Sequence, residues 1–321
     1  MRCLLLVLLA ALFHAPAGYG KSLRPSTRAA APLCSPQGKA FSRFELAVLG
    51  SGGPRGFGRA ASSYAVFLDG TARVLVDVGP GAFVRLGEMD IDFSAVDTLL
   101  LTHLHIDHSG DVPGFVKSRD LSGDQPLMTF RFFGPSGGGD YPSTTDFIDR
   151  LFGPRGAFAY LPKFRNQLRF QVTDLPTQPG SGVHEVLREN GLHITSIAVD
   201  HDDVPGVAFR LEHAGHALVV SGDLASKNEN LALLASGADL LVYDTAVVDP
   251  PGSPKMLYDL HTPPRRIGEI AAAAGVKSLL LSHIPPAVEK AKVEVMRSVR
   301  ASFKGRTRFA EDCLRVDLMK P

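Results

Sequence analysis

Short apolar runs separated by Gly- and Pro-rich segments recur along the chain from Phe44 onward. Runs rich in β-branched and aromatic residues predict strands, and apolar residues at helical spacing predict helices. Strands come first and helices are interspersed later, which favours an α/β fold with two sheets packed between helix layers. The predicted strands cover 44–49, 63–68, 74–77, 98–101, 128–133, 193–199, 207–212, 217–221, 240–244 and 278–282. The predicted helices cover 81–88, 112–119, 142–152, 228–235 and 264–274.

The ends of this pattern suggest a domain organisation. Arg2, the ten apolar residues 4–13 and the small residues at 15–17 predict a signal peptide over 1–17, with a buried N-terminal helix as the alternative. Ten apolar residues are too few to cross a bilayer, so no stable membrane insertion is expected after cleavage. Residues 18–40 are expected to form a flexible linker. Residues 41–321 are expected to form one catalytic domain, with an insertion or lid around 152–182.

The cysteines and the charge refine this picture. A protein exported to the periplasm or the medium would lose Cys3 and keep Cys34 and Cys313, which could form a disulfide or remain two free thiols. The chain has 34 basic and 33 acidic residues and a net charge of +1, without a basic stripe. We therefore expect a small-molecule substrate and no nucleic-acid partner. A homodimer remains possible.

The segment from His103 to His108 suggests a metal site, because His103, His105, Asp107 and His108 fall within six residues directly after an apolar run. Imidazoles and carboxylates are common ligands of first-row metals. The alternative is a polar surface loop rich in histidine.

Three further candidate ligands follow predicted strands in the same way, and ligands at strand ends can converge on one edge of a layered fold. These are His201, Asp223 and His283. The seven groups suffice for two metals of four or five ligands each. The histidines at 184, 193, 213 and 216 lie away from these segments and are expected at the surface or in loops.

The chain resembles the metallo-β-lactamase superfamily, and the resemblance extends over about residues 44–318. It rests on the His-x-His-x-Asp-His segment 103–108 and on the motifs at 49–53, 76–81, 200–206, 221–223 and 281–283. The resemblance implies a four-layer αββα sandwich and a dinuclear zinc site, although such ligands could also bind manganese or iron. It assigns His103, His105 and His201 to the first metal. It assigns Asp107, His108 and His283 to the second, with Asp223 bridging both.

The same resemblance implies a chemistry. A hydroxide shared by the two metals would attack the substrate, and Asp107 belongs to the predicted catalytic residues as well as to the ligands. Asp77 and Thr102 could orient ligand imidazoles, although Asp77 could equally be a turn residue that ends a strand.

Residues 243–246 and 261–263 resemble the branch of exported bacterial proteins related to ribonuclease Z and arylsulfatases. There, His261 would protonate the leaving group and Asp244 would orient it. The alternative is that His261 merely flanks the helix that starts after Pro263.

The predicted activity is zinc-dependent hydrolysis of a phosphodiester, a sulfate ester, or a carboxylic ester or lactone. A role in transfer-RNA processing is not expected, because export would separate the protein from that substrate. Two alternatives are a mononuclear iron enzyme that oxidises a thiol with oxygen and a non-catalytic exported metal-binding protein.

Overall fold

The computed structural model of the chain describes residue 34 and residues 41–121, 128–164, 168–178 and 180–320. The signal peptide expected over 1–17 lies outside the described residues, as does all but Cys34 of the linker expected over 18–40. The described residues belong to one compact unit.

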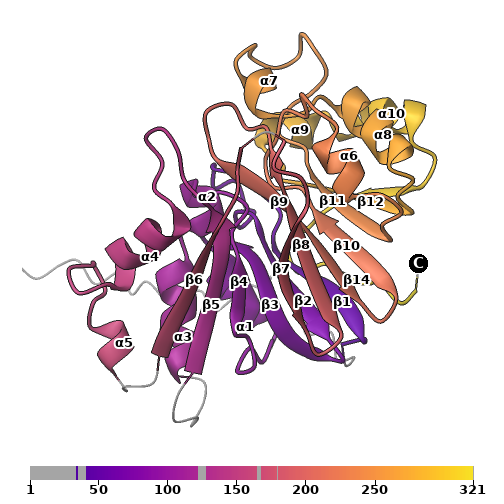
Figure 1. Ribbon diagram of the computed structural model, residues 1–321. Helices are drawn as coiled ribbons and strands as arrows, with labels where there is room; N and C mark the ends of the chain where they lie inside the picture. Colours follow the sequence, from indigo (N-terminus) through magenta and orange to yellow (C-terminus); the bar gives the residue numbers. More distant parts are fainter. Residues whose placement is uncertain (1–33, 35–40, 122–127, 165–167, 179, 321) are drawn as a thin grey trace, which may run out of the picture. The chain divides into compact units, whose positions relative to one another are not determined.

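The described strands form two seven-stranded sheets (Figure 1). The first sheet has the order β14 (Arg315–Asp317), β1 (Phe44–Gly50), β2 (Ser63–Leu68), β3 (Thr71–Val78), β4 (Thr98–Leu100), β5 (Met128–Pro135) and β6 (Leu168–Leu175). The second has the order β13 (Arg306–Phe309), β12 (Ser278–Ser282), β11 (Leu240–Asp244), β10 (His216–Val220), β9 (Gly206–His213), β8 (Leu192–Val199) and β7 (His184–Glu189).

Helices cover the outer face of each sheet. Apolar residues of the first sheet pack against α1 (Ala82–Glu88), α3 (Val112–Leu121) and α4 (Thr144–Phe152). Those of the second pack against α6 (Asn230–Leu234), α8 (Pro264–Ala273) and α10 (Lys292–Ser302). The short helices are α2 (Ile106–Ser109), α5 (Leu161–Phe164), α7 (Leu257–Leu260) and α9 (Pro286–Lys290). The predicted four-layer αββα sandwich is confirmed.

The alternation of side chains along β1 shows how the layers are held. Phe44, Leu46 and Val48 point into the core between the sheets, whereas Ala47 and Leu49 point toward the helices of the first sheet. All five side chains are fully buried. A strand that is apolar on both faces fits a position between two packed layers.

Strand direction places the functional segments. β3 and β4 run parallel, and so do β10, β11 and β12. β8 is antiparallel to β9, which is antiparallel to β10, so β8 runs in the same direction as β10. The carboxyl ends of these strands therefore meet at one edge of each sheet, the edge near α2 and α7 in Figure 1.

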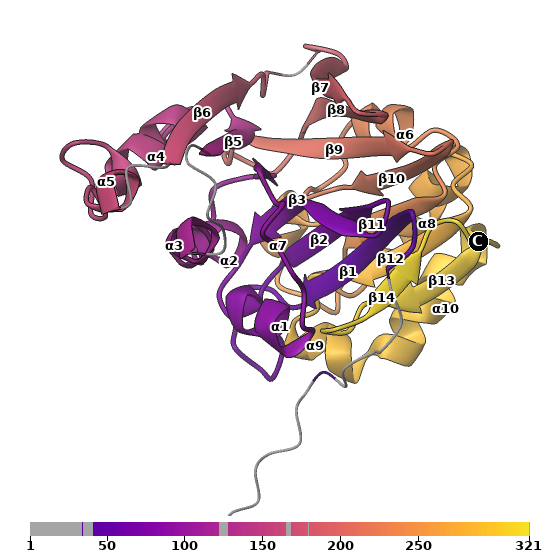
Figure 2. The same cartoon turned by 90° about the horizontal axis from the view of Figure 1, so that it is seen from below.

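Some parts of the fold were not predicted. The segment expected as an insertion contains α5 and β6, and β6 pairs in parallel with β5 as the outer strand of the first sheet. In Figure 2, α5 and β6 lie on the same side of the molecule as α4. Beyond Ser282, α9, α10, β13 and β14 were also not predicted.

Two further features bear on the expected topology. Cys34 and Cys313 are joined by a disulfide, with their Cα atoms 5.5 Å apart. Among the described residues, the helices are too short or too polar to cross a membrane.

Candidate metal centre

All seven predicted metal-binding residues lie at the carboxyl-terminal edges of the two sheets. His103 and His105 follow β4, and Asp107 and His108 are in α2 directly after them. His201 follows β8, Asp223 follows β10 and His283 follows β12. The structure brings these seven residues together in two adjoining clusters.

The first cluster contains His103, His105 and His201, each of which offers a nitrogen within 4.8 Å of the others. Nε2 of His103 lies 3.1 Å from Nδ1 of His105. Nδ1 of His201 donates a 2.8 Å hydrogen bond to the carbonyl of Leu260. This bond turns the other nitrogen of His201, Nε2, away from Leu260, and that buried atom has no hydrogen-bond partner among the described residues.

The second cluster contains Asp107, His108, Asp223 and His283, all of them buried. Nε2 of His283 lies 3.1 Å from Asp107 and 3.2 Å from Asp223. Nε2 of His108 lies 3.4 Å from Asp223. Among the described residues, the ion-pair partners of these two carboxylates are all imidazoles.

These donors fit a pair of divalent cations. Buried carboxylates need cationic partners, and a set of nitrogen and carboxylate ligands suits zinc, manganese or iron. Nε2 of His108 is also buried without a hydrogen-bond partner among the described residues. A void of about 10 Å³ lies beside His108, Asp223 and His283. The two clusters can thus each hold one ion, and Asp223 is placed between His108 and His283 in the second.

Charge is balanced within the second cluster by protons. Burial opposes the charged form of His108, but Asp223 and Asp77 outweigh burial and raise its pKa well above the ordinary value. Burial likewise opposes the charge on His283, and Asp223 and Asp107 raise its pKa to about 9. Burial raises the pKa of Asp223, but His283 and His108 outweigh it and hold that pKa well below the ordinary value. Bound cations would take the place of these protons.

Asp77 connects the ligand segments. It is the second-last residue of β3 and has a left-handed backbone, at φ 53°. One carboxylate oxygen accepts a 2.8 Å bond from the backbone N–H of Thr102, and the other accepts from the Thr102 hydroxyl and from Nδ1 of His108, each at 2.8 Å. Asp77 therefore orients His108, and β3 continues past Asp77 to Val78 instead of ending there.

His261 and Asp244 lie beside the second cluster. Nδ1 of His261 is 2.7 Å from Oδ2 of Asp244, and Oδ1 of the same carboxylate is 3.4 Å from Nδ1 of His283. The ring centroids of His261 and His283 are 5.6 Å apart, and those of His261 and His201 are 5.5 Å apart. His261 is thus next to both clusters, with its Nε2 as the nitrogen not held by Asp244.

Three features near the clusters were not predicted from the sequence. The hydroxyl of Tyr141 lies 3.5 Å from Nε2 of His105. The carbonyl of Leu260 orients His201. A Cβ added to Gly53 would lie 2.7 Å from Cε1 of His283, so this glycine leaves room for the imidazole. The turn at 49–53 is one of the motifs in the sequence, but its contact with a residue 230 positions later is not visible there.

Comparisons with known proteins agree with this geometry. Residues 72–284 match the family described as Beta-lactamase superfamily domain. Ribonuclease Z of Mycobacterium avium (strain 104) is 28% identical over 293 residues, which cover 86% of this chain and 99% of that protein. Ribonuclease Z of Mycolicibacterium gilvum (strain PYR-GCK) is 29% identical over 290 residues, which cover 85% of this chain and 96% of that protein.

Solved structures show the same fold. The metallo-beta-lactamase fold protein YhfI from Bacillus subtilis has a TM-score of 0.65 at 19% identity, covering 85% of this chain and 98% of that one. Human tRNase Z, short form, has a TM-score of 0.65 at 19% identity, covering 85% and 99%. Zn(2+)-bound PqqB from Methylobacterium extorquens has a TM-score of 0.62 at 19% identity, covering 85% and 99%.

Proposed function

The chain belongs to the beta-lactamase superfamily, and we propose that it is a dinuclear metal-dependent hydrolase that cleaves phosphodiester bonds. One observation carries the proposal: two adjoining clusters of buried His and Asp side chains, with the His261–Asp244 pair beside them. The similarity to proteins called ribonuclease Z favours a phosphodiester over the sulfate and carboxylic esters. The zinc-bound relative of the same fold favours zinc.

The proposed ligands follow the clusters. His103, His105 and His201 would hold one ion, and Asp107, His108 and His283 the other, with Asp223 between them. A pair of divalent cations supplies a water molecule acidified toward neutral pH and Lewis acidity that neutralises the developing negative charge. Because the clusters supply ligands for two ions, they favour the dinuclear hydrolase over a mononuclear iron enzyme.

The protein's own residues would position the reaction. Leu260 fixes His201 through its carbonyl, and Asp77 fixes His108 through its carboxylate, so that each imidazole presents Nε2 to its cluster. His105 is the more accessible imidazole of the first cluster, and Ile106 next to it is 73% exposed, so substrate would approach from this side.

His261 would supply the proton. Burial opposes the charge on its imidazole, but Asp244 outweighs burial and raises the pKa of His261. An imidazolium that donates through Nδ1 to Asp244 keeps a second proton on Nε2. We propose that this proton goes to the oxygen of the leaving group as its bond to phosphorus breaks.

The substrate can be identified with a panel of esters. The purified, zinc-loaded chain is tested with bis(p-nitrophenyl) phosphate, p-nitrophenyl sulfate, p-nitrophenyl acetate and a precursor transfer RNA. We expect the phosphodiester to be hydrolysed fastest and the transfer RNA to be left intact. Preference for the sulfate or the acetate would overturn the choice of phosphodiester, and cleavage of transfer RNA would overturn the proposed small-molecule substrate.

Metal analysis of the same sample tests the centre. We expect two metal ions per chain, and we expect Asp223→Ala to lose metal and to reduce turnover on the order of 100-fold or more. Asp149→Ala in α4, which removes an exposed carboxylate outside both clusters, is the matched control. One iron per chain together with oxidation of a thiol would support the alternative enzyme, and two ions without ester hydrolysis would support the metal-binding protein.

We also propose that the protein works in the periplasm or outside the cell. The pattern of residues 1–17 supports export, and the Cys34–Cys313 disulfide suits an oxidising compartment. The N-terminal sequence of the protein recovered from a native host tests this, since it should begin close to residue 18. A protein recovered from the cytoplasm with an intact N-terminus would rule out export.

A further inference from the structure

A second cavity lies at the other end of the strands that carry the proposed metal ligands. Asp239 and Ser278 precede or begin β11 and β12 and line this cavity, whereas Asp244 and His283 lie at the far ends of the same strands. Five residues of a strand span roughly 16 Å. The cavity is therefore separate from the proposed reaction site.

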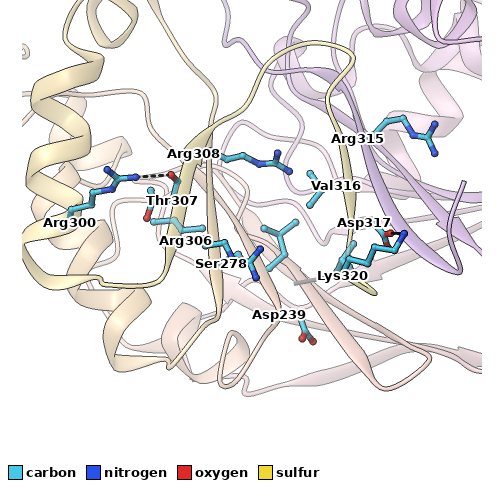
Figure 3. A pocket seen from close by; sticks show the side chains of 13 residues that line it. Asp239, Ser278, Arg300, Arg306, Thr307, Arg308, Arg315, Val316, Asp317 and Lys320 are labelled. Carbon is cyan, nitrogen blue, oxygen red and sulfur yellow. Dashed lines mark hydrogen bonds and ion pairs between the residues drawn. The ribbon is translucent and has the colours of Figure 1, made fainter. Parts of the chain in front are cut away.

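The outer strands of the two sheets form its walls. β13 contributes Arg306 and Arg308 from one side, and Val316 of β14 and Lys320 face them from the other (Figure 3). The cavity has a volume of about 490 Å³, within the range of small-molecule sites. We call it the β13–β14 groove.

The two arginines occupy positions that are apolar elsewhere on the same face. Arg306 and Arg308 lie in register with Ser278 and Leu280 of β12, and Leu280 packs in the core between the sheets. Two residues further on, Ala310 packs in that core as well. The arginines therefore lie where the core between the two sheets opens to solvent. The buried residues Leu240 and Leu318 form an apolar floor beneath them.

The charges of this groove are not balanced by its carboxylates. Asp239 is already paired with Lys277 at 2.7 Å, and Asp317 lies 3.4 Å from Lys320. Arg315 is paired with Glu45. The guanidinium groups of Arg306 and Arg308 form no ion pair or hydrogen bond with the described part of the chain.

The two arginines also repel each other. Both side chains are exposed to solvent, and desolvation by the walls of the groove and then the charge of Arg306 lower the pKa of Arg308. Arg300 stands beside them and donates to the carbonyl of Thr307 at 3.3 Å, which leaves its charge uncompensated by that contact (Figure 3). An anion placed between these guanidinium groups would relieve the repulsion.

We propose that the β13–β14 groove binds a small phosphate-bearing molecule, with Arg306 and Arg308 contacting its phosphate and the apolar floor contacting the remainder. Guanidinium groups match phosphate oxygens with paired hydrogen bonds, which is why arginine is preferred for this recognition. The size of the cavity favours a molecule such as a nucleoside monophosphate over a polymer.

Calorimetric titration of the zinc-loaded protein with pyrophosphate, adenosine 5′-monophosphate and adenosine tests this. We expect binding of pyrophosphate and of the nucleotide but not of adenosine, with the nucleotide tighter if the floor contributes. The double variant R306Q/R308Q should bind at least about tenfold more weakly. The matched control R155Q/R297Q removes the same charge from exposed positions outside the groove and should bind as the wild type does.

Each of the following results would overturn the proposal. Equal binding by the wild type and R306Q/R308Q would place the phosphate elsewhere, including at the metal centre. Equal loss in both double variants would indicate only a general charge effect, and absence of binding to the wild type would exclude the site. Binding of an RNA oligomer but not of pyrophosphate would indicate a polymer surface. Hydrolase activity is measured in parallel and should be unchanged in R306Q/R308Q, so this test does not depend on the proposed reaction.

Discussion

Asp244 contacts His261 and His283 with its two carboxylate oxygens, at 2.7 Å and 3.4 Å respectively. One side chain at the end of β11 thereby positions the proposed proton donor next to a proposed metal ligand. Asp244 is 4% exposed, so its charge acts on both imidazoles without much screening by water. Substitutions at this pair should thus separate the transfer of the proton from the binding of metal.

The first prediction concerns the leaving group. His261→Gln removes the proton donor, so turnover should fall about 10²- to 10⁴-fold for phosphodiesters with poor leaving groups and much less for p-nitrophenol, which leaves without a proton. The measurement is kcat across a series of aryl phosphodiesters with increasing leaving-group pKa. His193→Gln on β8, away from both clusters, serves as control. An unchanged dependence on the leaving group would mean that His261 is not the acid.

The second prediction concerns pH. Burial disfavours the imidazolium of His261, but Asp244 raises its pKa above 6.5, and the active form of an acid is the protonated one. Activity should therefore be retained below the raised pKa and decline as pH increases through it. Asp244→Asn removes the negative charge, so the alkaline decline of kcat/KM should move to lower pH. If this decline keeps its position in Asp244→Asn, the pair does not control the proton.

A third prediction follows from the protons held in the metal-free second cluster. Burial opposes the charge on His283, but Asp223 and Asp107 raise its pKa to about 9, so at about pH 8 it carries a proton that a metal must displace. The pKa of His108 is raised as well, with Asp223 and Asp77 outweighing burial. Zinc added to chelator-treated protein should thus release protons. Calorimetry in buffers of different ionisation enthalpy measures their number, and a heat independent of the buffer would contradict the prediction.

Much of the site could be predicted because each proposed ligand follows an apolar strand. The run ending at Val199 predicts β8, and His201 comes two residues after it. Asp223 likewise follows β10, and His283 follows β12. Strands buried on both faces carry a strong apolar signal, and their parallel order brings their carboxyl ends together.

The outer strands of the sheets have no comparable apolar run in the sequence. β13 has the sequence Arg-Thr-Arg-Phe and β14 has only three residues, because outer strands bury little and charged residues protect them against pairing with other chains. α10 buries only Val295 and Val299, so its apolar stripe is short. These elements depend on contacts between distant parts of the chain.

The burial of one histidine also depends on contacts between distant parts of the chain and could not be predicted from the sequence. His213 was expected at the surface or in a loop, but it is the last residue of β9 and is 5% exposed, so that expectation was wrong. Its ring lies edge-on to Phe44 of the other sheet, with 5.8 Å between the ring centroids. The turn at 214–215 is visible in the sequence, whereas the approach of β1 from the opposite layer is not. Packing between sheets decided the burial of this polar side chain.

The fourth prediction uses two glycines of one loop. In Gly53→Ala the new Cβ would lie 2.7 Å from the imidazole of His283, closer than side chains tolerate, so His283 must move. We expect weaker retention of metal and roughly 10- to 100-fold lower turnover, as for residues that orient ligands. Gly56→Ala is the matched control, because a Cβ there meets nothing within 4 Å and φ is not positive. Equal metal content and activity in both variants would show that the loop yields without disturbing His283.

The last prediction concerns the disulfide between Cys34 and Cys313, which are 279 residues apart. In the loop-entropy model so long a loop stabilises the folded chain by up to ~5 kcal/mol, and loss of a native disulfide commonly costs about 2–5 kcal/mol. Cys34→Ser/Cys313→Ser should therefore unfold at a lower urea concentration than the wild type.

The turn that carries Cys313 is also held by other contacts, so the metal centre should survive loss of the disulfide. The backbone N–H of Cys313 donates to the carbonyl of Val48, and Asp312 accepts from the N–H groups of Ser51 and Ala60. Metal content and turnover in buffer without urea should accordingly match the wild type. A reductant should lower the urea midpoint of the wild type and leave the double variant unchanged. If the reductant has no effect on the wild type, then the disulfide contributes nothing to the free energy of unfolding, because its only role in that model is to restrict the unfolded chain.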